Sequence, residues 1–106
     1  MSEGMSSGAD AARPWEDVDP RLNVFALANG MDLSKGEGFR RLEWFSEGRE
    51  RGIFIECGED STFRVSVLSW ESGSTDERHQ STLGSGLSAR DLSVALAGAI
   101  DAANAL

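Results

Sequence analysis

The chain has 106 residues, a formal net charge of −8 at pH 7 and a single cysteine, Cys57. This length suffices for one domain, and a lone cysteine excludes an internal disulfide framework. An acidic surface is repelled by phosphate backbones, so nucleic acid is an unfavourable partner, whereas a basic protein is a permitted one.

Residues 1–13 have the composition of a disordered acidic tail. They are rich in Ser, Gly, Ala and acidic residues, and Met1 and Met5 are their only sizeable apolar groups. Such a segment buries too little surface to offset its ordering entropy, so we expect a single α+β domain over residues 14–106. The segment lacks the basic and apolar regions of a secretory signal, and no apolar run approaches the ~20 residues of a membrane span. We therefore expect a cytoplasmic protein without a membrane partner.

Residues 19–30 carry helix signals at both ends. Asp19 suits a helix N-cap, Pro20 suits the first helical position, and Gly30 suits the residue after the last turn. Three apolar residues fall on one helical stripe: Leu22, Phe25 and Ala26. A strand that enters a tight turn at Asn29-Gly30 is the alternative, and the paired end signals favour the helix.

The next segment, residues 28–38, is rich in glycine and contains Lys35. A phosphate-binding loop requires Gly-Lys followed by Ser or Thr, whereas the order here is Ser34-Lys35-Gly36. We therefore expect a plain loop.

Apolar and polar residues alternate, as in β-strands, over residues 39–46, 53–57 and 62–70. The charged stretch 47–52 and the polar stretch 58–61 have the composition of turns. Residues 78–83 are polar and suit only a fourth strand at a sheet edge. These segments predict a three- to four-stranded antiparallel β-meander, flanked by an N-terminal helix and packed on one face by a C-terminal helix.

The C-terminal segment is a strongly amphipathic helix. Ser88 is placed as its N-cap, with Asp91 three residues later, in a pattern close to a capping box. The apolar stripe consists of Leu92, Leu96, Ala99, Ala103 and Leu106, widened by Ala95 and Ile100. We expect this apolar stripe to pack on one face of the sheet.

The sequence holds little catalytic machinery. His79 is the only histidine, so it and Cys57 cannot supply the ligands of a zinc site. A Cys57–His79 nucleophile pair is conceivable, but Cys57 shares a strand face with Ile53 and Ile55, which is typical of a buried structural thiol. Two adjacent acid pairs, Glu59–Asp60 and Asp76–Glu77, fall in turns where carboxylates stay solvated. We therefore expect no enzyme activity, metal, cofactor or small-molecule ligand.

The predicted sheet has apolar residues on both faces. One face forms a continuous core from Leu42, Trp44, Ile53, Ile55, Phe63, Val65 and Val67. The other carries candidate partner-binding residues: Phe45, Phe54, Leu68 and Trp70, with Glu43, Glu56 and Arg64 among them. A solvated face of an antiparallel sheet should instead be polar.

Three explanations of this second face compete. The segment over residues 15–30 folds across it, or two copies of the chain meet there, or it binds a different protein. The last two give the two function classes that we carry forward. The first class is a small acidic binding module of the inhibitor, immunity, chaperone or adaptor type. The second is a self-associating structural or accessory protein that forms a homodimer through the same face.

Overall fold

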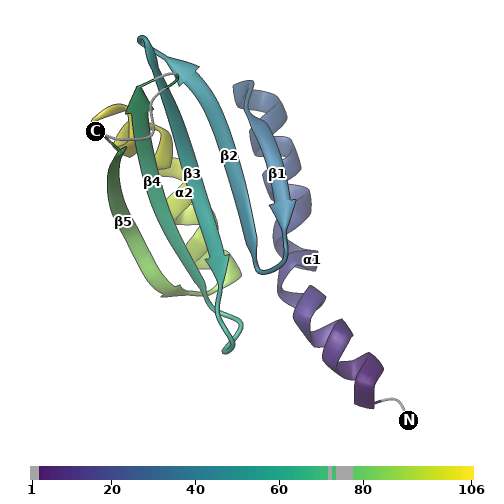
Figure 1. Ribbon diagram of the computed structural model, residues 1–106. Helices are drawn as coiled ribbons and strands as arrows, with labels where there is room; N and C mark the ends of the chain where they lie inside the picture. Colours follow the sequence, from purple (N-terminus) through teal and green to yellow (C-terminus); the bar gives the residue numbers. More distant parts are fainter. Residues whose placement is uncertain (1–2, 72, 74–77) are drawn as a thin grey trace.

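The computed structural model describes residues 3–71, 73 and 78–106, with side chains from Pro14 onward except that of Arg78. The described elements, in chain order, are α1 (Glu3–Asn29), β1 (Asp32–Gly36), β2 (Phe39–Ser46), β3 (Arg49–Cys57), β4 (Phe63–Glu71), β5 (Arg78–Leu87) and α2 (Ala89–Asn104). The strands form one antiparallel sheet in the order β1-β2-β3-β4-β5, and both helices lie against the same face of it (Figure 1). The α+β class is confirmed. The predicted number of strands was too low, because the described sheet has five.

The additional strand is β1, which the sequence predicted as a loop. It pairs with β2 along its whole length, from Asp32 opposite Glu43 to Gly36 opposite Phe39. Its side chains are mostly exposed, so backbone pairing at a sheet edge, rather than an apolar pattern, makes it a strand. A Cβ at Gly36 would overlap the present position of the Phe39 ring, so a larger residue there would require this ring to move.

The strand β3 begins at Arg49, whereas the sequence placed a turn over residues 47–52. The turn consists only of Glu47 and Gly48, both in the left-handed region with φ of 53° and 78°. This is the conformation of a tight two-residue hairpin loop. The charge of the segment was misleading, because Arg51 is only 3% exposed and donates a 2.8 Å hydrogen bond to the carbonyl of Ala103 in α2.

Helix α1 is confirmed over residues 19–29, but it starts earlier than the sequence indicated. Asp19 is inside the helix rather than at its N-cap, and it binds Arg40 of β2 in a bidentate pair with distances of 2.7 and 3.1 Å. The Arg40 guanidinium also lies 4.1 Å from the centroid of the Trp15 ring, and Trp15 meets Phe63 edge-on at 5.2 Å. These contacts attach α1 to the core.

The first turns of α1 project past the end of the sheet (Figure 1). Their backbone is helical from Glu3, whereas residues 1–2 and the side chains of residues 1–13 lie outside the described part. The prediction that residues 1–13 are disordered in solution therefore stays a prediction.

Helix α2 matches its sequence signals. The Ser88 hydroxyl oxygen accepts a 3.1 Å hydrogen bond from the backbone N–H of Asp91, which confirms the N-cap. Its buried stripe consists of Leu92, Leu96, Ala99 and Ala103. The helix covers the core face over β3, β4 and β5, as expected.

Candidate functional site: the open face of the sheet

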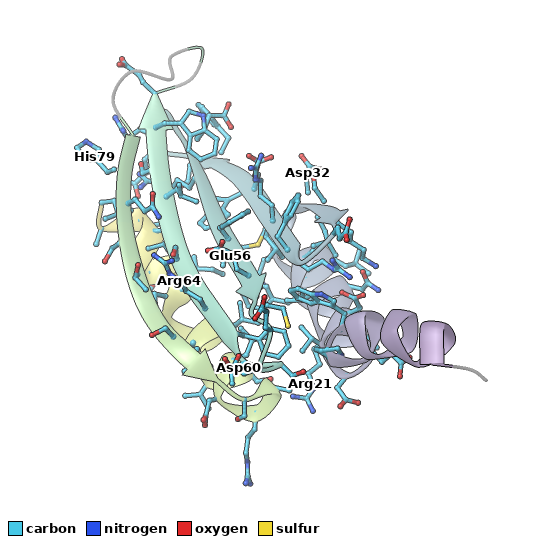
Figure 2. All side chains as sticks on the ribbon, turned by 60° about the horizontal axis from the view of Figure 1, so that its bottom comes forward. Arg21, Asp32, Glu56, Asp60, Arg64 and His79 are labelled. Atoms are coloured by element: carbon cyan, nitrogen blue, oxygen red, sulfur yellow. The ribbon has the colours of Figure 1, made fainter. Side chains whose placement is uncertain are left out.

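The sheet face that points away from both helices is not covered by any described element (Figures 1 and 2). The expectation that residues 15–30 fold across it is wrong. Trp15 is 4% exposed and Leu22 is fully buried, and both belong to the core cluster that contains Ile53. Within the described part of the chain the second apolar face is therefore uncovered, and we call it the open face.

Strand register brings the open-face residues together in cross-strand pairs. Between β3 and β4, Gly52 lies opposite Leu68, and Glu56 lies opposite Arg64. Between β2 and β3, Glu43 lies opposite Gly52. Since side chains alternate along each strand, all five residues point to the same side.

These pairs enclose a hollow of 410 Å³ at the centre of the open face. The hollow is lined by Arg41, Glu43, Gly52, Phe54, Glu56, Arg64, Leu68, Trp70 and Gln80. Gly52 is one of the lining residues but is itself buried. A Cβ at Gly52 would lie 3.4 Å from the ring of Trp70, so this ring stands beside the glycine as one wall.

Aromatic and charged groups contact one another around the hollow. The Phe39 and Phe54 rings lie 5.5 Å apart in a tilted arrangement. The Arg41 guanidinium lies 5.6 Å from the centroid of the Phe54 ring. The Arg64 guanidinium and the Glu56 carboxylate approach to 4.0 Å, and Figure 2 shows the two residues on neighbouring strands. Arg41 and Arg64, which both line the hollow, therefore already contact other side chains of this protein.

All but one of the candidate partner-binding residues line this hollow. The exception is Phe45, which lies on the same face but outside the lining, with 61% of its surface exposed. The sequence interpretation missed Gly52, because it assigned this residue to a turn. It also missed Gln80, whose polar strand gave no sign of facing the aromatic residues.

The nucleophile pair that the sequence left open is not assembled. Cys57 lies opposite Phe63 and His79 lies opposite Ser69, so they are at opposite ends of β4, roughly 20 Å apart along the strand. Cys57 packs against the core but is partly rather than fully buried. Burial raises the pKa of its thiol above the ordinary value, and the nearby Asp60 carboxylate raises it further. A thiol in this state is a poor nucleophile.

The acid pair Glu59–Asp60 occupies the exposed loop between β3 and β4. Thr62 donates to Asp60 from its hydroxyl at 2.6 Å and from its backbone N–H at 3.2 Å. These hydrogen bonds lower the pKa of the Asp60 carboxyl, which is the behaviour of a loop-capping residue. The pair Asp76–Glu77 lies outside the described residues. Within the described part, no three His, Cys, Asp or Glu residues converge in a way that could hold a metal ion.

Among the described residues, no helix is both long and apolar enough to cross a bilayer. Comparison with known proteins identifies no matching family, no similar curated protein and no similar solved structure.

Proposed function

We propose that this protein is a non-enzymatic binding module that holds another protein against the open face, as an inhibitor, immunity protein, chaperone or adaptor does. The observation that carries the proposal is the hollow of 410 Å³ on a sheet face that no described element covers. Aromatic groups flanked by arginine and carboxylates have the composition of binding hot spots, and a hollow suits an inserted side chain.

A binding role also agrees with the chemistry of the remaining surface. Cys57 and His79 are too far apart to act together, and burial raises the pKa of the thiol above its ordinary value. The acid pair beside Cys57 caps a loop through Thr62. These features support a protein that acts by contact rather than by catalysis.

Self-association through the same face is the second candidate. The observation in its favour is Phe45, an aromatic residue of the open face with 61% of its surface exposed. In a symmetric dimer, each copy would place this ring against the other copy. Two chains that each carry a net charge of −8 repel each other, which favours a different, basic partner.

The test is affinity purification from a lysate of the native organism with three forms of the protein. These are the wild type, the double variant Phe54→Ala/Trp70→Ala, and the control Leu27→Ala, which removes a side chain of α1 that is 86% exposed. We expect a stoichiometric protein with the wild type and the control that is lost with the double variant. Binding must then be reproduced with the two purified proteins.

Two further measurements separate the alternatives. Sedimentation equilibrium of the wild type would reveal a dimer that the double variant dissociates, and this result would favour self-association. Thermal denaturation reports on folding. A monomeric protein whose melting temperature collapses in the double variant would show that Phe54 and Trp70 serve the fold, which would contradict both candidates.

A further inference from the structure

We infer that the partner presents a lysine or arginine next to a large apolar side chain. The apolar group enters the hollow beside Trp70, and Glu43, assisted by Asp32, binds the cation. This inference rests on the proposed function, because it specifies the chemistry of the protein that the open face binds.

Two like charges lie opposite each other at the β1–β2 edge of the sheet. Asp32 of β1 and Glu43 of β2 are register partners on the open face. Like charges directly opposite each other destabilise two antiparallel strands, so this arrangement lowers the stability of the folded protein. Neither carboxylate forms an ion pair with any other described residue. The ion pairs between described residues join Arg40 to Asp19 and Arg64 to Glu56. A cation supplied from outside would relieve the repulsion.

The described basic side chains near this pair of carboxylates are directed elsewhere. Arg41 points its guanidinium over the Phe54 ring on β3, which lies on the opposite side of β2 from Asp32. Arg64 is near Glu56 on the far side of the hollow, while Asp32 lies at the edge strand (Figure 2). Lys35 alternates to the helix-covered side of β1. Among the described side chains, the charge around the hollow is therefore uneven, with a negative end at Asp32 and Glu43.

Glu43 lies on the wall of the hollow. It is the register partner of Gly52, and the Trp70 ring stands beside Gly52. An apolar side chain that enters the hollow beside Trp70 therefore places its own neighbours near Glu43. Trp70 and Leu68 supply the apolar walls, and an indole ring also attracts a cation. The net charge of −8 would steer such a basic segment toward the protein.

The probe for this inference is a phage-displayed library of random peptides about twelve residues long, selected on the purified protein and eluted in competition with free protein. The length matches a segment that could cross a sheet of this size. We expect the recovered peptides to share a Lys or Arg beside a Trp, Phe, Leu or Met. Two of them, synthesised and titrated by calorimetry, should bind Glu43→Lys roughly tenfold more weakly than the wild type.

Two variants make the measurement specific. Glu59→Lys introduces the same change of charge in the β3–β4 loop, outside the lining of the hollow, and should change the affinity far less. A peptide whose basic residue is replaced by Glu should recover affinity for Glu43→Lys relative to the wild type. This exchange of charge identifies Glu43 as the contact, which a general loss of folding could not imitate.

The outcomes distinguish the inference from the proposed function. Peptides that lose affinity in Gly52→Ala, but that lack a basic residue and tolerate Glu43→Lys, would overturn the inference and leave the open face as a binding site. A library that yields no peptide sensitive to Gly52→Ala or Trp70→Ala would overturn both.

Discussion

Gly52 and Trp70 form the centre of the open face, where the indole ring stands beside a residue that has no side chain. A methyl group at Gly52 would meet this ring at 3.4 Å, which is ordinary van der Waals contact, and the backbone there is not left-handed. A methyl group can therefore be accommodated at Gly52 without straining the strand.

Gly52→Ala should preserve or raise stability while it weakens binding to the open face. Replacing glycine where the backbone suits alanine restricts the unfolded chain and stabilises by about 0.4–1 kcal/mol. The measurement is the free energy of unfolding in urea, together with affinity for a partner. Gly48→Ala is the matched control. Its φ is 78°, so this substitution should be destabilising without affecting the open face. Equal loss of stability in both variants would contradict the geometry at Gly52.

Asp19→Ala should lower the free energy of unfolding by about 2–4 kcal/mol, because it leaves the charge of Arg40 nearly buried without its carboxylate partner. The Arg40 side chain is 10% exposed and its Nε lies 2.7 Å from an Asp19 oxygen. Asp17→Ala, which removes an exposed carboxylate two residues earlier, should change stability by less than about 0.5 kcal/mol. Chemical denaturation of both variants makes the comparison. Near-equal values would mean that the Asp19–Arg40 pair contributes nothing.

Cys57 should react slowly with iodoacetamide in the folded protein. Its raised pKa leaves a smaller fraction of thiolate at neutral pH, so the rate should rise at a higher pH than for an unfolded thiol. The folded state holds this proton more tightly, so the contribution to stability is present below the unfolded pKa and is lost as pH rises through the folded one. Asp60→Asn removes the secondary cause and should speed the reaction modestly. A fast reaction at neutral pH in the wild type would refute this assignment.

Removing residues 1–13 should leave the melting temperature nearly unchanged. Their composition offers little apolar surface, and the first described core residue of α1 is Trp15, which is 4% exposed. A longer truncation through Val18 removes two buried side chains and should destabilise by several kcal/mol. A marked loss of stability on removing 1–13 alone would show that the segment packs on the domain.

The sequence predicted the parts of the fold that depend on side-chain periodicity. Helix α2 follows from the stripe through Leu92 and Leu96, and the alternation around Ile53 separates the two sheet faces. Strand β1 escaped prediction because its residues are mostly exposed and its pairing uses the backbone. Arg51 escaped because a buried guanidinium that bonds the end of α2 looks, in sequence, like part of a charged turn.

The side of the sheet that α1 covers also could not be predicted. Its stripe through Leu22 would fit either apolar face, and no local pattern selects one. The choice is made by contacts distant in sequence, namely Trp15 with Phe63 and Asp19 with Arg40. Arg40 gave no signal, since a charged residue in a strand is usually assigned to solvent. The alternation in the sequence therefore placed the candidate residues on one sheet face, whereas the fact that α1 leaves this face uncovered depends on tertiary contacts.

The two outer strands have a consequence for solubility. The edge strands of an open sheet have unpaired backbone N–H and C=O groups, and these groups can pair with the edge of another copy and promote aggregation. Here the register between β4 and β5 shifts between Phe63 and Ser66, and β1 at the opposite edge is short and carries Asp32 and Lys35. An irregular edge and a short charged edge are both poor templates for another strand. Both margins of the sheet therefore resist pairing with another chain, although the apolar face between them is uncovered by any described element.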